Sequence, residues 1–247
     1  MKRVVEFSGV DKYYDGLQVL RDISFNISRG EVTCLLGPSG SGKTTIFNLA
    51  AGLLEPDSGL VKVRKDVRRG YVFQESRLLP WKTLEENIEF VQENYLSPEK
   101  AARERERLFR LTRLSGARDK YPGELSGGMK QRLELVRAFS VLPDLVLMDE
   151  PFRSLDTRTV YHLREMLLTF RRERELTYLL ITHDPGEAAM MADKILVLSV
   201  GPAEIVERYN VNTLREARHP RRGEINNLIA DITNLFVKLV DFPQEDR

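Results

Sequence analysis

The sequence lacks the features of several large protein classes. It holds one cysteine in 247 residues, Cys34, so a disulfide scaffold is excluded. Because Cys34 lies inside an apolar run, we expect a buried core thiol rather than a reactive one. No stretch of 18 consecutive apolar residues occurs, and the start MKRVVEFSGV has no continuous apolar segment. We therefore expect neither a membrane span nor a signal peptide.

The chain also lacks an excess of either charge. Thirty-eight Lys and Arg residues oppose 37 Asp and Glu residues, which leaves a net charge of +1. No global field would attract nucleic acid or an anionic membrane, although a local patch remains open. The 42% hydrophobic and 30% charged residues are ordinary for a globular protein of one or two domains. Since we expect no membrane span, any membrane role must act through a partner.

The first third of the chain predicts mainly strands. Residues 3–10 and 18–28 alternate in character and are rich in β-branched side chains, which favours an antiparallel start. The apolar run at 32–37 predicts a buried strand, and a helix should follow from Lys43 to Ala51. Two further extended stretches follow this helix, GLVKVRK and GYVFQ.

A helical insertion follows these strands. Thr83 and Glu86 form a possible capping box, and Ser97-Pro98 opens a helix rich in Arg and Glu. From Leu145 a strand and helix rhythm returns, with helices begun at Asp156 and Asp184. Apolar residues at helical spacing over 223–240 predict an amphipathic helix that packs on its own domain, with partner binding as the alternative.

The stretch GPSGSGKTT, residues 37–45, predicts a phosphate-binding loop. It satisfies the pattern GxxxxGK[ST], in which glycines let backbone N–H groups approach phosphate oxygens. Lys43 would contact the β and γ phosphates, and Thr44 would give a hydroxyl to Mg²⁺. The expected nucleotide-binding residues here are Gly37, Pro38, Ser39, Gly40, Ser41, Gly42, Lys43, Thr44 and Thr45.

A metal carboxylate and a base are expected after a second buried strand. LVLMDEP places Asp149 and Glu150 at the carboxyl end of residues 145–148, where ligands of open α/β sheets bind. Asp149 would orient Mg²⁺, and Glu150 would accept a proton from the attacking water. Taken alone, such a pair is usually a solvated strand end, but the glycine loop favours the functional reading.

The stretch LSGGMKQR, residues 125–132, carries the strongest resemblance. With Gln74 in VFQE, SLD at 154–156 and His183 in ITHD, it resembles the ATP-binding subunit of an ATP-binding-cassette (ABC) transporter over roughly residues 3 to 200. The resemblance implies an α/β fold: a P-loop NTPase (RecA-like) core with an antiparallel β portion and an inserted helical subdomain. We expect the ATPase domain at 1–218, the helical subdomain at about 80–143, and a C-terminal helix and tail at 219–247.

The resemblance also implies a homodimer with two composite ATP sites. Ser126 can cap a helix start, and in the family Ser126, Gly127 and Gly128 bind the nucleotide held by the opposite subunit. Asp156 matches the carboxylate that crosses toward the other site, and it would also serve as an ordinary helix cap.

Three further roles follow from the resemblance. His183 matches the histidine that contacts the γ phosphate, and Gln74 matches the glutamine that reaches Mg²⁺ and the attacking water. Tyr14 matches the aromatic residue that stacks on adenine. Tyr13 is the alternative stacking residue, and core packing is the non-functional reading of either ring.

The subgroup is indicated by GYVFQESRLLPWKTLEENI and HPRRGEI, which resemble the ATPases of nitrate, sulfonate and taurine importers. This implies a peripheral subunit at the cytoplasmic face of a bacterial inner membrane, working with two transmembrane permease subunits and a substrate-binding protein, without nucleic acid. The alternatives are an importer of pyrimidine or thiamine precursors and a non-transport ABC ATPase of nucleic-acid-associated or regulatory type. The chain departs from the family in two places. The segment at residues 60–70 is shorter than expected, and Arg153 stands where a small residue is usual.

The apolar residues Leu78 to Trp81 have two readings. They could form a small local core, or a docking surface for the membrane subunit, since the family's docking groove lies between the Gln74 segment and the helical subdomain. We expect docking.

Overall fold

The computed structural model describes residues 2–153, 155–211 and 222–241. Its chain divides into two compact units: unit 1 contains Met1–Lys65 and Thr177–Arg247, and unit 2 contains Asp66–Leu176. The predicted boundary at residue 218 and the first three residues of the HPRRGEI stretch, 219–221, lie outside the described residues. None of the described helices combines the length and hydropathy that crossing a bilayer demands.

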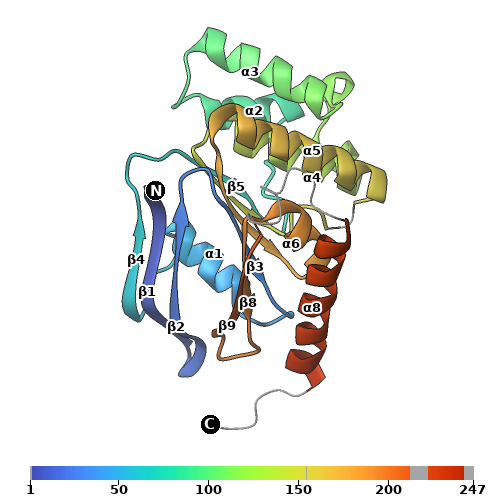
Figure 1. Cartoon of the computed structure of the whole chain (residues 1–247). Coiled ribbons are helices and arrows are strands. Elements are labelled where there is room, and N and C mark those ends of the chain that lie inside the picture. The colour runs from blue at the N-terminus through green and yellow to red at the C-terminus, as the bar shows by residue number, and fades with distance from the viewer. Residues whose placement is uncertain (1, 154, 212–221, 242–247) are drawn as a thin grey trace. The chain divides into compact units, whose positions relative to one another are not determined.

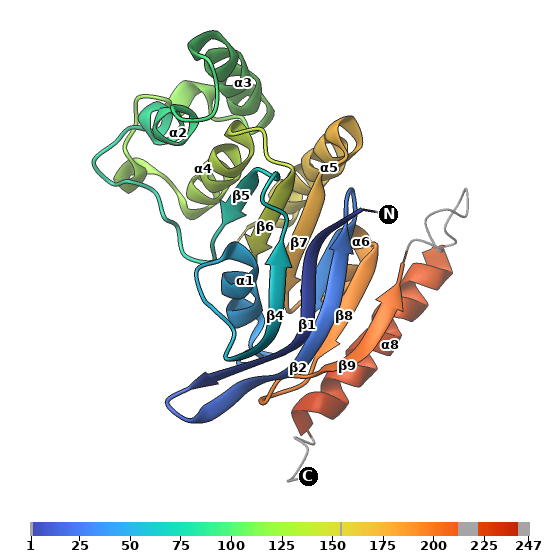
Figure 2. The same cartoon turned by 90° about the vertical axis from the view of Figure 1, so that its left-hand side faces the viewer.

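Unit 1 begins with an antiparallel sheet, as the sequence predicted. β1 (Arg3–Tyr14) pairs with β2 (Leu17–Ser28) and with β4 (Ser58–Val63), in the order β2-β1-β4 (Figure 2). The Phe7 and Phe25 side chains are buried, and their rings stack at 4.6 Å between centroids. Alternation of apolar and polar residues along β1 thus gives the sheet one buried face.

The second set of strands in unit 1 is mostly parallel. β3 (Val32–Leu36) lies between β7 (Thr177–Thr182) and β8 (Lys194–Leu198). Every residue of β3 and β7 is buried, as continuous apolar runs in parallel sheets require. β9 (Ile205–Asn210) adds an antiparallel edge strand to β8.

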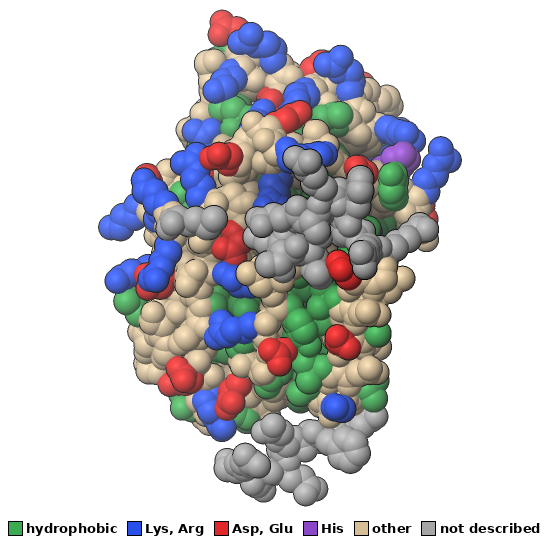
Figure 3. All heavy atoms as spheres, viewed as in Figure 1, with side chains coloured by type: hydrophobic (Ala, Val, Ile, Leu, Met, Phe, Trp, Pro, Cys, Tyr) green, Lys and Arg blue, Asp and Glu red, His purple; other side chains and the backbone are tan. Residues whose placement is uncertain are grey.

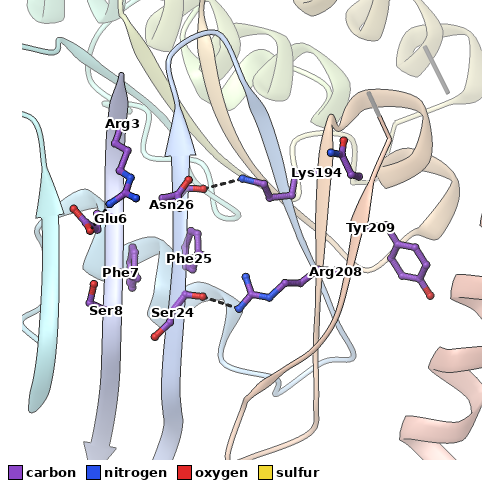
Figure 4. A pocket seen from close by; sticks show the side chains of 11 residues that line it. Arg3, Glu6, Phe7, Ser8, Ser24, Phe25, Asn26, Lys194, Arg208 and Tyr209 are labelled. Carbon is purple, nitrogen blue, oxygen red and sulfur yellow. Dashed lines mark hydrogen bonds and ion pairs between the residues drawn. The ribbon is translucent and has the colours of Figure 1, made fainter. Parts of the chain in front are cut away.

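A groove of about 450 Å³ lies between β1 and β2 on one side and β8 and β9 on the other (Figure 4). Two long cations of the β8–β9 pair reach β2 there. The Nη2 of Arg208 donates to the carbonyl of Ser24 at 2.7 Å, and the Nζ of Lys194 donates to the carbonyl of Asn26 at 3.0 Å. These bonds tie the two sheets of unit 1 together.

Three helices belong to the described part of unit 1. α1 (Lys43–Ala51) packs against β7 and β4, and α6 (Pro185–Met191) contacts both β3 and α8 (Arg222–Asp241). Figure 1 shows α8 running beside α6. Among the side chains of α8 that the structure describes, Leu228 and Ile232 are buried, so the predicted amphipathic helix is confirmed and packs on its own unit. Other hydrophobic side chains are visible at the surface of the molecule in Figure 3, which has the same view as Figure 1.

Unit 2 contains a parallel strand pair covered by a helix. β5 (Arg69–Val72) pairs with β6 (Leu145–Asp149), and α4 (Gly127–Ser140) packs on β5. A Cβ atom on Gly70 would lie 2.4 Å from the carbonyl oxygen of Ala138, so only glycine permits this close approach.

The predicted helical insertion is also present in unit 2. It comprises α2 (Leu84–Gln92) and α3 (Pro98–Leu111), followed by the short 3₁₀ turns η1 (Ser115–Ala117) and η2 (Pro122–Glu124). Both predicted helix starts are confirmed, because Thr83 and Glu86 form the capping box and Pro98 opens α3. α2, α3 and α4 pack together (Figures 1 and 2).

The Gln92 side chain ties these three helices to one another. Its Nε2 donates to the carbonyls of Ala101 in α3 and Ser140 at the end of α4. The last long helix of the unit, α5 (Thr157–Arg174), follows β6.

Candidate functional site

The glycine loop connects β3 to α1 with a backbone that only glycine adopts easily. Gly40 and Gly42 have φ values of 82° and 70°. Gly42 is the N-cap residue of α1 and makes no side-chain cap bond. The first turn of α1 therefore presents N–H groups without a capping side chain, which is the arrangement that binds anions at helix starts.

Lys43 is buried, and acceptors of the loop itself hold its ammonium group. The Nζ donates to the carbonyls of Gly37 at 2.8 Å and Pro38 at 2.7 Å, and to the Oγ of Ser41 at 3.2 Å. The cation thus lies inside the loop, close to these three acceptors, whereas the Thr44 side chain beside it is exposed.

Strand register brings the loop and His183 to one edge of the sheet. β3 and β7 are parallel, and Leu36 pairs with Thr182, the last residue of each strand. The chain therefore leaves the sheet at Gly37 and at His183 from adjacent positions. This is the carboxyl edge of parallel strands, where ligands of open α/β sheets bind.

Hydrogen bonds on both sides fix the backbone that carries His183. The Thr182 hydroxyl donates to Glu187 Oε2 at 2.6 Å and accepts from the Asp184 N–H at 3.1 Å. Asp184 in turn caps α6 by accepting from the Gly186 N–H at 2.6 Å. The His183 side chain is exposed at this edge.

The two candidate adenine-stacking residues end β1. Tyr13 is 43% and Tyr14 41% exposed, so core packing is excluded for both rings. The Nζ of Lys12 lies 5.7 Å from the centroid of the Tyr14 ring, and the backbone N–H of Tyr13 donates to Asp57. Both rings are accessible for stacking.

Cys34 lies on β3, shortly before the glycine loop. It is fully buried, and burial raises the pKa of its thiol well above the ordinary value, with a smaller contribution from the negative charge of Glu187. A thiol so far from ionisation is a weak nucleophile. The expected inert core thiol is confirmed.

In unit 2, Asp149 and Glu150 lie at the end of β6. Asp149 is buried, and Glu150 has a φ of 47°, in the left-handed region. The Glu150 carboxylate forms an ion pair with Arg153, with 3.3 Å between Oε2 and Nη1. Sequence reasoning missed this pair; an arginine three residues after the candidate base was its only signal.

The LSGG segment forms an open helix start. Ser126 caps α4, its Oγ accepting from the Met129 N–H at 3.3 Å. A Cβ atom on Gly127 would meet nothing within 4 Å, so there is space beside this helix end. The predicted cap and anion-binding geometry are both compatible with this start.

Gln74 follows β5 and is exposed, and the residues after it are anchored to α4. The buried carboxylate of Glu134 accepts from the Ser76 hydroxyl at 3.0 Å and from the Arg77 N–H at 2.6 Å, and pairs with Arg137 at 2.6 Å. Sequence reasoning missed this link, although a glutamate on an otherwise apolar helix face was a signal. The LSGG helix therefore holds the segment that follows Gln74.

Asp156 caps α5, as predicted. Its carboxylate accepts from the Thr159 N–H at 3.0 Å and from the Thr159 hydroxyl at 2.6 Å. The hydroxyl bond is the main cause that lowers the pKa of Asp156. Ser154, in the same motif, lies outside the described residues.

The candidate metal-binding side chains supply oxygen atoms. Thr44 of unit 1 offers a hydroxyl and Asp149 of unit 2 a carboxylate, and Mg²⁺ prefers such oxygen donors, usually one or two protein groups together with phosphates and water. In the parts of the chain that the structure describes, no three His, Cys, Asp or Glu side chains gather into a metal cluster. Each of the two side chains is thus of a type that suits Mg²⁺ bound together with a nucleotide.

Known proteins are similar to this chain in sequence and in fold. The sequence profile of the family described as ABC transporter matches residues 20–153. The taurine import ATP-binding protein TauB of Yersinia pestis bv. Antiqua is 39% identical over 216 residues, which cover 85% of each chain. The aliphatic sulfonates import ATP-binding protein SsuB of Bacillus licheniformis is 38% identical over 194 residues, covering 76% of this chain and 75% of that protein.

A solved structure supports the same assignment. It is the dimeric structure of a post-hydrolysis state of an ATP-binding cassette bound to ADP and Pi. It has a TM-score of 0.75 and 28% identity to this chain, and the match covers 84% of this chain and 98% of that one. The chain therefore belongs to the ABC transporter family and is one of its ATP-hydrolysing subunits.

Proposed function

We propose that this subunit powers the import of a small solute bearing an oxyanion, such as taurine, another sulfonate or nitrate. The relatives named above are import ATP-binding proteins for taurine and for aliphatic sulfonates. The stretches that resemble the nitrate, sulfonate and taurine subgroup point the same way. The subunit acts as a homodimer at the cytoplasmic face of the inner membrane, with two permease subunits and a substrate-binding protein.

One observation carries the proposed site. The register that pairs Leu36 with Thr182 places the phosphate loop and His183 at the same edge of the sheet. There the loop N–H groups and the Lys43 ammonium bind the phosphates of ATP, and His183 contacts the γ phosphate. Tyr14 stacks on the adenine ring.

The remaining groups complete the reaction. Thr44, Asp149 and Gln74 hold Mg²⁺, which when bound neutralises charge on the phosphates. Glu150 accepts a proton from the attacking water. Ser126, Gly127, Gly128 and Asp156 act on the nucleotide of the partner subunit. ATP binds both subunits only when they are closed, so its hydrolysis shifts the pair toward the open state and drives transport.

The test is the substitution Glu150→Gln. It keeps the shape of the side chain and removes the base, so turnover should fall by about a hundredfold or more. ATP should still bind, and the closed dimer should accumulate. ATP turnover and the mass of the ATP-bound species are measured on one preparation. Near-normal turnover would refute the assigned role, and loss of ATP binding would show a structural role instead.

Import is tested in cells that lack this gene. We expect poor growth on taurine as the sole sulfur source or on nitrate as the sole nitrogen source, rescued by the wild-type chain and not by Glu150→Gln. Growth that is unaffected on every such solute would contradict the proposed cargo class while leaving the ATPase assignment intact.

A further inference from the structure

Gln74 lies in an irregular segment of unit 2 that is bonded to a neighbouring helix. Residues 73–83, all of which the structure describes, contain no strand or helix, so backbone ladders do not fix this segment. Instead, Glu134 of α4 holds it. One carboxylate oxygen, Oε1, accepts from the Ser76 hydroxyl at 3.0 Å and from the Arg77 N–H at 2.6 Å.

Arg137, one turn after Glu134 on α4, completes this anchor. Its Nη2 pairs with Glu134 Oε2 at 2.6 Å, and its Nη1 donates to the Arg77 carbonyl. The N–H and the C=O of Arg77 are thus both held by charged side chains of α4. The Arg77 guanidinium in turn lies 5.5 Å from the centroid of the Phe73 ring. Gln74 is therefore bracketed by two residues, Phe73 and Arg77, that contact each other.

The burial of Glu134 makes this anchor hard to release. Its side chain is fully buried, and a buried charge that loses its hydrogen-bond donors is strongly destabilising. Ser76 and Arg77 cannot leave α4 without removing two of those donors. A buried ion pair nevertheless adds little net stability compared with apolar side chains of the same volume. What Glu134 supplies is therefore a fixed position for the segment.

The helix that carries this anchor also begins with the LSGG segment. Ser126 caps α4, which runs from Gly127 to Ser140, and Glu134 follows the cap by about two turns. The proposed contact to the partner's nucleotide and the anchor of the Gln74 segment thus belong to one short helix.

We propose that Glu134 is a positioning residue for Gln74. Together with Arg137 it anchors residues 73–77 on the LSGG helix and holds the Gln74 side chain where the reaction uses it. This inference rests on the proposed role of Gln74 in ATP hydrolysis.

The decisive variant is Glu134→Leu in the full chain, because leucine fills a similar volume and accepts no hydrogen bond. We expect kcat for ATP hydrolysis to fall about tenfold and KM for ATP to stay within about twofold, because a small misplacement of a reacting group slows the chemical step. Glu134→Gln keeps an acceptor oxygen for Ser76 and Arg77, so it should restore most of the rate. A glutamine variant as slow as leucine, or a leucine variant with normal kcat, would contradict the proposal.

Glu104→Leu is the matched control. Glu104 is another buried carboxylate of unit 2, and its oxygens lie 3.2 Å from guanidinium nitrogens of Arg107 in α3 and Arg174 in α5. Leucine at this position removes the same kind of ion pair without removing a bond to the Gln74 segment. We expect normal kcat in this variant, and a loss as large as that of Glu134→Leu would show that any buried pair of the unit has the same effect.

Amide hydrogen exchange tests the anchor without nucleotide or Mg²⁺. Because Glu134 accepts from the Arg77 N–H, exchange in peptides that cover residues 73–77 should become faster by on the order of tenfold in Glu134→Leu. The Glu104→Leu control should exchange there like the wild type. Unchanged exchange in Glu134→Leu would show that Glu134 does not anchor the segment.

A double-mutant cycle tests whether Glu134 acts through Gln74. Gln74→Ala should lower kcat by itself, and adding Glu134→Leu should then lower it little further. Two effects that simply multiply would overturn the positioning role. Ser76→Ala, at an exposed position, provides a second cycle should the leucine variant not fold. It removes one bond of the anchor, so it should lower kcat about twofold alone and not in the Gln74→Ala background.

The outcomes distinguish this inference from the function on which it rests. A reduced kcat for Gln74→Ala together with a normal kcat for Glu134→Leu would overturn the role of Glu134 alone. A normal kcat for Gln74→Ala would instead refute the proposed role of Gln74, and the positioning role with it.

Discussion

At the scale of single residues, Tyr13 and Tyr14 end the same strand with nearly equal exposure. Neighbouring side chains of a strand point to opposite faces, so only one ring can face adenine. We expect Tyr14→Ala to weaken ATP binding by about 1 to 3 kcal/mol, and GTP binding equally, because stacking tolerates any base. Tyr13→Ala should have the smaller effect. Equilibrium binding of both nucleotides measures this.

Matched thermal unfolding curves would show that neither tyrosine variant loses the fold. If Tyr13→Ala weakens binding more than Tyr14→Ala does, the residue that stacks on adenine is Tyr13 and not Tyr14. Equal losses would show that both rings contribute to the nucleotide site.

The sequence predicted the backbone of the candidate site well where it follows from local chemistry. The glycines of the loop and the adjacent lysine define a phosphate loop wherever they follow a strand and precede a helix. The pairing of Glu150 with Arg153 could not be predicted in this way. It depends on the positive φ of Glu150, a conformation that glutamate rarely adopts and that leaves no mark in the sequence.

At the scale of elements, helix starts were the most predictable features. Thr83, Ser126, Asp156 and Asp184 each cap a helix, and all four lie where the sequence indicated a start. Caps are recognisable because they act within four residues of chain. β9 was missed, because its sequence IVERYN is largely exposed along an edge and carries no continuous apolar run.

The link between α4 and the Gln74 segment depends on a buried charge. Burial is the largest effect on Glu134 and raises the pKa of its carboxyl, against the opposing effects of Arg137 and of the bonds from Ser76 and Arg77. The folded state therefore binds this proton more tightly than the unfolded state does. The contribution of Glu134 to the free energy of unfolding is fully present below an ordinary glutamate pKa of about 4.3. It is lost as pH rises through the raised pKa that Glu134 has in the folded state.

Urea unfolding of wild type and Glu134→Gln across this pH range tests the sign. The free energy of unfolding of the wild type, minus that of the variant, should fall as pH increases above about 4.3 and then level off. A difference that rises with pH would show that the ion pair with Arg137 outweighs burial.

At the scale of the whole molecule, we expect Trp81 to mark a surface for the membrane partner. Its side chain is 70% exposed, so the reading of a small local core is wrong for this residue. The loop is nevertheless fixed, because the Asn87 side chain accepts from the Leu79 N–H at 2.8 Å and donates to the Lys82 carbonyl at 3.0 Å. A large exposed aromatic ring on a rigid loop is a favoured anchor in interfaces.

Trp81→Ala should leave ATP binding and the ATPase activity of the isolated chain nearly intact. We expect it to weaken assembly with the permease by about 2 kcal/mol or more and to reduce transport accordingly. Co-purification with the membrane subunits, beside the ATPase rate of the chain alone, measures both. Unchanged assembly would place the docking surface elsewhere.

The pairing of β3 also determines when this protein becomes able to bind nucleotide during its synthesis. β3 pairs with β7 and β8, and both are encoded after the whole of Asp66–Leu176. At about 5 to 20 residues per second, a ribosome takes on the order of ten seconds to travel from one to the other. Unit 2 leaves the ribosome as one uninterrupted stretch and can fold during that interval. The strand that carries the phosphate loop gains its neighbours only after Asp66–Leu176 has been translated, so a nascent chain stalled earlier holds the loop without its support.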